Sequence, residues 1–220
     1  VEEACAITEE GGIVPTTSVG NSASYAILAD KVIIELNLDS PAELEGLHDI
    51  YIPQMRPTRP PIPVVAPDSR IGTPYIPIDP EKIAAIVVTR GKDSPSTVLP
   101  PDADTRHIAD HLIRFFSDEV SAGRLAPSLL PLQAGIGTMA NAVMSGLAEG
   151  PFEHLTMYSE VLQDSTFDLL DAGKLDFASG CSITLSEACG ERVWSNLDAY
   201  RDRLILRPQE LSNHPGIVRR

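Results

Sequence analysis

Residues 128–207 alternate short apolar runs with amphipathic stretches, and this alternation limits the possible folds more than any other feature of the chain. Short apolar runs are typical of strands, and the stretches between them have helical spacing. Strand and helix in alternation predict a mainly parallel sheet with right-handed crossovers. The fold class is therefore α/β, with mainly parallel open sheets and flanking helices. We expect strands near 128–134, 154–159, 175–179 and 203–207, and helices near 138–148 and 162–172.

The first half of the chain adds two strands, and a long helix follows them. Lys31–Leu38 and Ile83–Thr89 are apolar runs that predict buried strands. Asp104 and Thr105 are expected to cap the helix, since short polar side chains favour that position. The polar, proline-bearing segment Gly91–Asp104 is the predicted domain boundary. The apolar face of the helix is expected to hold Ile108, Leu112, Phe115, Phe116 and Val120.

Residues 52–80 carry nine prolines. This density excludes a sheet ladder or a helix and predicts an extended segment packed across a surface. The segment contains a PxxP pattern from Pro57 to Pro60, which is compatible with a ligand for an SH3-type domain. Interleaved Ile, Val and Tyr residues favour an ordered structural arm.

The charge balance argues against two classes of partner. The 220 residues include 17 basic and 31 acidic side chains, for a formal net charge of −14. Such a surface repels phosphate backbones and anionic lipid, so we expect neither nucleic acid nor a membrane as partner. The sequence also has no apolar run near the roughly 20 residues that a membrane helix needs. A local basic pocket for an anionic ligand stays compatible with this charge.

The cysteines and histidines point to no metal or disulfide framework. Cys5, Cys181 and Cys189 are an odd number without a CxxC pair, which is typical of reduced, buried thiols in a cytoplasmic protein. Five scattered histidines lack metal-ligand spacing, so no metal site is expected. The first residues lack the basic and apolar regions of a signal peptide. The chain starts without a methionine, and we expect it to be a fragment of a longer protein.

A glycine turn before the expected helix at 138–148 is the first candidate binding site. Gly135-x-Gly137-x-x-Ala140 fits the loose dinucleotide-binding pattern, and Glu160 follows Ala140 by twenty residues, near the spacing of a ribose-binding acid. This pattern is compatible with an NAD(P)-binding oxidoreductase. The free N–H groups of the helix start are equally suited to a phosphate or to the oxyanion of acyl transfer. A tight turn without a ligand is the third interpretation.

Three other groups carry possible chemistry. Glu160 lies where an apolar run ends and a helix is expected. Taken alone, this position is typical of a solvated acid in the first turn of a helix. Asn213 lies in Ser212-Asn-His-Pro, which on its own reads as a turn. His48 and Asp49 have the composition of a catalytic pair, but we expect them to serve in a turn.

Several longer motifs follow one another along nearly the whole chain. They are Ala6-Ile-Thr-Glu-Glu-Gly-Gly-Ile-Val-Pro, Gly46-Leu-His-Asp-Ile-Tyr, Gly135-Ile-Gly-Thr-Met-Ala-Asn-Ala-Val-Met-Ser-Gly-Leu, Tyr158-Ser-Glu-Val-Leu-Gln-Asp and Ser212-Asn-His-Pro-Gly-Ile-Val-Arg-Arg. Motifs that occur together in register are more specific than any one of them. Together these motifs resemble the acetyl-CoA hydrolase/transferase family of class I CoA-transferases.

The resemblance implies an acyl-CoA:carboxylate CoA-transferase with a glutamate nucleophile. Glu160 matches the glutamate of the family's Tyr-(Ser/Thr)-Glu-Val motif. In the family this glutamate attacks an acyl-CoA, the released CoA thiolate attacks the resulting anhydride, and a glutamyl-CoA thioester remains. A second carboxylate then takes the CoA by the reverse steps, which gives ping-pong kinetics. The implied substrates are short acids of the acetate, succinate and propionate class.

The resemblance also assigns the residues around this nucleophile. The family's CoA and oxyanion contacts fall on Ala134, Gly135, Ile136, Gly137 and Thr138, with the backbone N–H of Ile136 as an oxyanion donor. Asn213 matches an asparagine that orients the carboxylate or the acyl group. CoA is implied as a substrate, with no permanently bound cofactor. Hydrolysis of acetyl-CoA, with water in place of the acceptor acid, is the related alternative.

The resemblance further implies how the chain is organised. Family members are longer, with two tandem α/β domains of the CoA-transferase fold, and form homodimers. Residues 1–100 are expected to be the latter part of the first domain, with the proline-rich arm at 52–80. Residues 101–220 are expected to be the front part of the second domain. Further CoA contacts and a second oxyanion donor are expected beyond Arg220, in the remainder of the polypeptide. A non-catalytic binding fragment is a third functional class.

Overall fold

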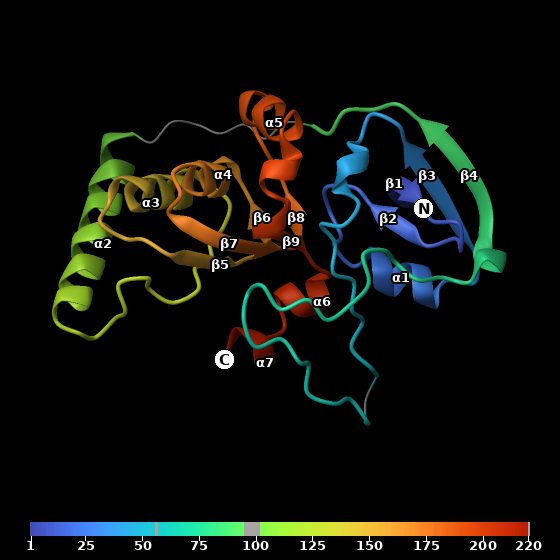
Figure 1. Ribbon diagram of the computed structural model, residues 1–220, viewed down its shortest axis with the longest axis horizontal. Helices are drawn as coiled ribbons and strands as arrows, with labels where there is room; N and C mark the ends of the chain where they lie inside the picture. The colour runs from blue at the N-terminus through green and yellow to red at the C-terminus, as the bar shows by residue number, and fades with distance from the viewer. Residues whose placement is uncertain (56, 95–101, 220) are drawn as a thin grey trace.

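The computed structural model describes residues 1–55, 57–94 and 102–219, and its strands form two main sheets and a short ribbon (Figure 1). The first sheet has the order β2-β1-β3-β4, with bounds β1 Glu2–Ile7, β2 Ile13–Pro15, β3 Val32–Asn37 and β4 Ile83–Thr89. The second sheet, β5-β7-β9, consists of β5 Leu155–Tyr158, β7 Leu175–Gly180 and β9 Leu204–Leu206. The ribbon pairs β6 Val161–Leu162 with β8 Ser182–Ile183.

The pairing confirms the predicted α/β class. Strands β1, β3 and β4 run parallel, as do β5, β7 and β9, and the ribbon is parallel too. The antiparallel pair β1–β2 is the exception among the named strands of the described residues. The helices are α1 Ser22–Leu28, α2 Ala103–Ser121, α3 Thr138–Glu149, α4 Asp164–Asp171, α5 Glu187–Trp194, α6 Gln209–Ser212 and α7 Pro215–Val218. Short 3-10 turns lie at Ala42–Leu44, Pro80–Lys82, Leu197–Ala199 and Arg201–Arg203.

The predicted strand at 83–89 exists as β4, but the prediction that it is buried is wrong. β4 is an edge strand at the rim of the first sheet (Figure 1), and its side chains from Ala84 to Val88 are exposed. Val88, for example, is 60% exposed. An apolar run indicates a strand, but it does not show how many neighbours the strand has. The partner strand β3, predicted at 31–38, does alternate between buried and more exposed side chains at its start.

The predicted long helix exists as α2, but its cap and its inner face differ from the prediction. The cap is Asp102, whose carboxylate accepts a hydrogen bond from the backbone N–H of Thr105 at 2.8 Å. The face that packs on the core contains Ile113, Phe116 and Val120. Ile108 and Phe115, which we expected to face inward, are exposed. The end of a helix is commonly misplaced by one or two residues, which accounts for the cap. Ile113, Phe116 and Val120 are three and four residues apart and share one stripe of the helix, whereas Ile108 and Phe115 lie about 80–100° around the helix from Phe116.

The strand predicted near 128–134 is wrong. This segment contributes one isolated parallel bridge, between Leu132 and Met157. Pro131 has no N–H to donate to a ladder, and Leu129 has a positive φ of 56°. These two residues break the extended conformation that the apolar side chains would otherwise favour.

The proline-rich arm packs across a surface, as predicted, and the structure shows that this surface belongs to both halves of the chain. Ile76 exchanges backbone hydrogen bonds with Ile13 of the first sheet at 2.7 and 3.0 Å. Ile62 and Val64 lie in an apolar cluster with Leu211 and Ile217, beside the second sheet. Residue 56 of the arm lies outside the described residues. Of the predicted boundary 91–104, residues 95–101 also lie outside them, and the division into domains at residue 100 stays a prediction.

Candidate functional site

Glu160 lies at the carboxyl end of β5, between this strand and β6. Its backbone oxygen accepts hydrogen bonds from the N–H groups of Cys181 (2.7 Å) and Ser182 (3.1 Å), where β7 passes into β8. The prediction that Glu160 begins a helix is wrong, because β6 separates it from α4, which starts at Asp164. The side chain is exposed, and its Oε1 accepts a hydrogen bond from Nε2 of Gln209 at 3.1 Å. The carboxylate is thus open to a ligand and held from one side.

The glycine turn lies beside Glu160. Leu132 and β5 share backbone hydrogen bonds of 2.8 and 2.9 Å, which lead the chain alongside the strand that ends at Glu160. Ala134 then contacts Ser159, the residue before Glu160: the Ser159 hydroxyl donates to the Ala134 oxygen at 3.1 Å. The structure therefore brings together two motifs that are about twenty residues apart in the sequence.

The turn itself is open. Gly137 has a φ of 133° and precedes α3, in a backbone conformation that residues with a side chain rarely adopt. A Cβ added at Gly135 or Gly137 would meet no atom within 4 Å, and Ile136 is 74% exposed. No side chain caps the start of α3. The first N–H groups of this helix are therefore available to a negatively charged ligand.

Asn213 is not the amide that contacts Glu160 in this structure. It ends α6, its backbone N–H donates to the Gln209 oxygen at 3.0 Å, and its side chain is exposed. No hydrogen bond between Asn213 and Glu160 is found within the described residues. The contact comes from Gln209, at the start of the same helix. Sequence reasoning missed Gln209, since nothing in its local sequence separates it from an ordinary helix-start residue.

Tyr158 fixes α6 to the strand that carries Glu160. Its hydroxyl donates to the backbone oxygen of Leu211 at 2.8 Å. Burial raises the pKa of Tyr158 to about 12, although the nearby Arg207 acts in the opposite direction. The phenol therefore keeps its proton, and the hydrogen bond, at neutral pH.

A buried ion pair joins the two halves of the chain behind this site. Arg207, which follows β9, is 0% exposed and donates to the Asp49 carboxylate at 2.5 Å. The same guanidinium donates to the Ser179 hydroxyl at 2.9 Å and to the backbone oxygens of Pro67 and Ser69 at 3.0 and 2.5 Å. Burial lowers the pKa of Arg207, and the Asp49 carboxylate opposes this effect. Arg207 thus connects the second sheet to the proline-rich arm.

His48 and Asp49 do not serve in a turn, and this prediction is wrong. His48 forms a parallel bridge with Leu206, and the Asp49 N–H donates to the Leu206 oxygen at 2.8 Å. Both residues are about 1% exposed, and the second Asp49 oxygen accepts from the backbone N–H groups of Ile71 and Gly72. They are structural groups where the two halves of the chain meet. Their sequence neighbours gave no sign of this, because their partners lie far away along the chain.

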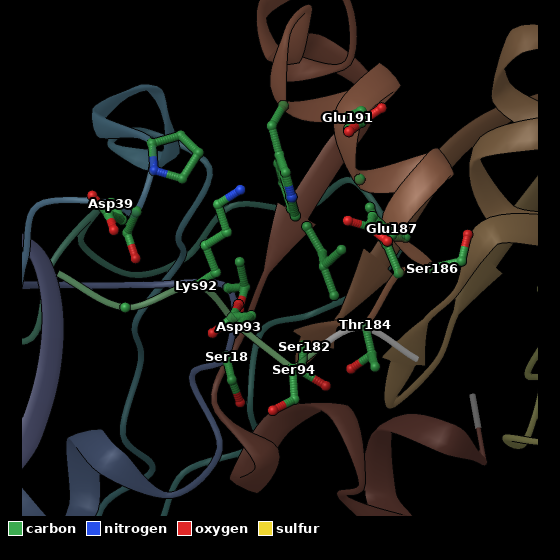
Figure 2. Close-up of a pocket in the computed structure, with 18 residues that line it drawn as sticks. Ser18, Asp39, Lys92, Asp93, Ser94, Ser182, Thr184, Ser186, Glu187 and Glu191 are labelled. Atoms are coloured by element: carbon green, nitrogen blue, oxygen red, sulfur yellow. The ribbon is translucent and has the colours of Figure 1, made fainter. Parts of the chain in front are cut away.

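A cavity of about 530 Å³ adjoins the site, between the first sheet and α5 (Figure 2). Ser182 in its wall donates to the backbone of Glu160, and Thr17 fixes Asp93 with a hydrogen bond of 2.7 Å. The described wall has one basic side chain, Lys92, and the acidic side chains Asp39, Asp93, Glu187 and Glu191. Such a wall disfavours phosphate groups. The glycine turn is therefore the better place for the anionic part of a ligand.

The remaining sequence expectations concern thiols, metals and the membrane. Cys5, Cys181 and Cys189 are free and buried, as predicted, and burial raises the pKa of Cys181 to about 11. Among the described residues, no three His, Cys, Asp or Glu side chains lie close enough to hold a metal ion. In the part of the chain that the structure describes, no helix has the length and apolar character needed to cross a membrane.

Comparison with known proteins decides the family. Residues 1–88 match the family model of the acetyl-CoA hydrolase/transferase N-terminal domain. Over 99% of its length the chain is 47% identical to acetyl-CoA hydrolase of Saccharomyces cerevisiae and 45% identical to succinyl-CoA:acetate CoA-transferase of Clostridium kluyveri. The chain belongs to the acetyl-CoA hydrolase/transferase family. It spans about 41% and 40% of the lengths of these two relatives.

Solved structures place this member of the acetyl-CoA hydrolase/transferase family in a known fold. RipA of Yersinia pestis aligns with 97% of the chain and 41% of its own length, at a TM-score of 0.64 and 17% identity. A 4-hydroxybutyrate CoA-transferase of Porphyromonas gingivalis aligns with 98% of the chain and 46% of its own length, at a TM-score of 0.61 and 17% identity. These likenesses confirm the predicted CoA-transferase-like fold, and at this identity they show the fold alone.

Proposed function

We propose that the full-length protein moves CoA between short-chain acyl groups and carboxylates through a glutamyl-CoA thioester on Glu160. The observation that carries the proposal is the exposed Glu160 carboxylate at the end of β5, directly beside the open glycine turn. A relative named as a succinyl-CoA:acetate CoA-transferase supports the reaction class. A carboxylate is a weak nucleophile, so its positioning and the stabilisation of developing charge supply much of the rate.

The first half of the reaction loads CoA onto the enzyme. An oxygen of Glu160 attacks the thioester carbon of acyl-CoA, the C–S bond breaks, and the CoA thiolate leaves. The product is an anhydride between the acyl group and Glu160. The thiolate then attacks the glutamyl carbon, the anhydride C–O bond breaks, and the acyl group departs as a carboxylate. Glu160 is left as a CoA thioester, and an acceptor carboxylate takes the CoA by the same steps in reverse.

The residues around Glu160 have separate tasks in this proposal. The backbone N–H of Ile136 donates to the oxyanion that forms during attack on the acyl-CoA. Ala134, Gly135, Gly137 and Thr138 form the surface for CoA, whose negative charge suits the uncapped start of α3. Asn213 orients the acyl group or the carboxylate from α6. CoA is a substrate here, and no resident cofactor is needed.

The broader organisation belongs to the same proposal. The protein acts as a cytoplasmic homodimer, and the remainder of the polypeptide supplies further CoA contacts and a second oxyanion donor. Residues 1–100 and 101–220 belong to two successive CoA-transferase domains. Sedimentation of the full-length protein at twice the monomer mass is the expected result, and a monomer at micromolar concentration would contradict the dimer.

Acetyl-CoA hydrolase activity is the second candidate, because several relatives carry that name. The two activities differ in the final acceptor, which is a carboxylate for the transferase and water for the hydrolase. The family assignment favours both over an oxidoreductase that binds NAD(P), despite the compatible glycine pattern.

The test measures release and transfer of CoA by the full-length protein. With acetyl-CoA, we expect formation of succinyl-CoA or propionyl-CoA only when succinate or propionate is added, and little CoA release without an acceptor. Glu160→Ala is expected to lose this transfer, whereas Glu153→Ala, which removes an exposed carboxylate at the opposite end of β5, is expected to keep it. Normal transfer by Glu160→Ala would refute the mechanism. Rapid CoA release without any acceptor acid would favour the hydrolase.

A further inference from the structure

The carboxylate of Glu160 has a defined hydrogen-bond donor that the proposed mechanism does not use. Nε2 of Gln209 donates to Oε1 of Glu160 at 3.1 Å. An amide donor suits this place, because it has no ionisable proton and cannot neutralise the carboxylate by proton transfer. The bond occupies one oxygen, and among the described residues no hydrogen bond is found at the other, Oε2, which is available to attack a carbonyl carbon.

Gln209 lies at the start of α6, a short helix that is hydrogen-bonded to both halves of the chain. The Gln209 backbone N–H donates to the Gly20 oxygen at 2.9 Å, which ties the start of α6 to the first half of the chain. The next residue, Glu210, accepts a hydrogen bond from the Ser24 hydroxyl on α1. The end of α6 is tied to β5 through Tyr158 and Leu211 at 2.8 Å. The amide of Gln209 therefore projects from a backbone that is anchored on two sides.

The two partners of this hydrogen bond share one buried support. Arg207 lies two residues before Gln209 and donates to the Ser179 hydroxyl at 2.9 Å. Ser179 in turn accepts the backbone N–H of Ser159 at 2.8 Å, and Ser159 is the residue before Glu160. The guanidinium thus supports the chain on both sides of the Gln209–Glu160 contact. Such support is what positions a reacting group within a fraction of an ångström.

We propose that Gln209 is a positioning residue that orients the Glu160 carboxylate for attack, supported by the buried Arg207–Asp49 pair. The inference rests on the proposed function, since it assigns Gln209 a task in forming the glutamyl-CoA thioester. It differs from the assignment of Asn213, because the structure places the amide of Gln209, and not that of Asn213, on the carboxylate. Loss of this orientation slows attack without removing the surface that binds CoA.

The test compares three variants of the full-length protein in a single turnover with acetyl-CoA. Gln209→Ala removes the side chain, and Gln209→Met keeps its length but not its N–H groups. Both are expected to slow the appearance of CoA on the Glu160 peptide by about 10- to 100-fold, with less than about a threefold change in the acetyl-CoA concentration that gives half the maximal loading rate. Gln54→Ala, a matched truncation of an exposed glutamine on the proline-rich arm, is expected to load CoA at the wild-type rate.

The variant with methionine separates positioning from packing. If Gln209 only filled space, Gln209→Met would restore the wild-type loading rate, and that result would overturn the inference. An unchanged rate in Gln209→Ala would overturn it as well. Both outcomes leave the proposed function intact as long as the wild-type protein carries CoA on Glu160. A wild-type protein that never carries CoA there would overturn the proposed function and this inference together.

Discussion

At the scale of single residues, His48 is a buried neutral group rather than a catalytic one. Its Nε2 contacts the backbone oxygen of Thr16 at 3.1 Å, and within the described residues its Nδ1 is buried without a partner. Burial lowers the pKa of His48 to about 4, the contact with Thr16 opposes this, and the charge of Arg70 adds to the lowering. The imidazole is therefore neutral in the folded protein at neutral pH.

This burial predicts a stability that depends on pH. The unfolded chain takes up a proton on His48 near pH 6.5, while the folded chain resists it down to about pH 4. This part of the unfolding free energy is fully present above pH 6.5 and is lost as the pH falls from 6.5 to about 4. We expect His48→Gln to reduce the drop in unfolding free energy between pH 7 and pH 4 by on the order of 2–3 kcal/mol.

Urea unfolding at several pH values measures this difference. His111→Gln, on the exposed side of α2, is the control, and its unfolding free energy is expected to change between pH 7 and pH 4 as that of the wild-type protein does. The same change in His48→Gln and in the wild-type protein would show that His48 does not carry this pH dependence.

At the scale of elements, the proline-rich arm is fixed by a close approach of two backbones. Ile50 and Thr73 exchange hydrogen bonds of 2.7 and 3.0 Å, and the Gly72 N–H donates to Asp49 at 2.6 Å. A Cβ on Gly72 would lie 2.2 Å from the Ile50 oxygen and 2.8 Å from the Tyr51 nitrogen. These neighbours are backbone atoms, which cannot rotate away.

Gly72→Ala is therefore expected to destabilise the fold and to displace the arm. Overpacking of this kind costs about 1–3 kcal/mol, and we expect the upper part of that range because backbone atoms are involved. The measurement is thermal or denaturant unfolding, together with limited proteolysis of the arm. Gly91→Ala is the control, because its added Cβ would meet no atom within 4 Å. Equal stability of the two variants would show that the arm is not packed as described.

Several elements could be predicted from their local pattern. The sequence predicts α3, α4, β5, β7 and β9 because each lies in one of the apolar or amphipathic stretches that alternate along this half of the chain. It does not predict the ribbon of β6 and β8, because two-residue strands have no period to detect. The segment near Pro131 has the apolar side chains of a strand, but Pro131 has no backbone N–H for a sheet hydrogen bond, so the predicted strand does not form.

At the scale of the whole molecule, one buried ion pair joins the first half of the chain to the second sheet. Asp49 and Arg207 are 158 residues apart in the sequence, and their side chains are 1% and 0% exposed. No local pattern could have paired them. The motifs of the candidate site were predictable because the family resemblance covers them, whereas the support behind it, Arg207 and Gln209, required the structure.

Asp49→Asn is expected to be strongly destabilising. Removal of one partner leaves a buried guanidinium without its counter-charge, which costs about 3–5 kcal/mol. Asp39→Asn removes the partner of Arg90 in an exposed pair, with side chains 33% and 69% exposed, and is expected to cost at most about 1 kcal/mol. Denaturant unfolding compares the two variants. A loss of at most about 1 kcal/mol in Asp49→Asn as well would show that the buried ion pair contributes little to folding.

The proposed reaction requires Glu160 to carry CoA covalently during turnover. The most direct test is peptide mass analysis of the full-length protein after incubation with acetyl-CoA and rapid quenching. We expect a CoA thioester on the peptide that contains Glu160, absent from Glu160→Ala and discharged when an acceptor carboxylate is added. A protein that transfers CoA while this peptide stays unmodified, or that carries CoA on another residue, would refute the proposed mechanism.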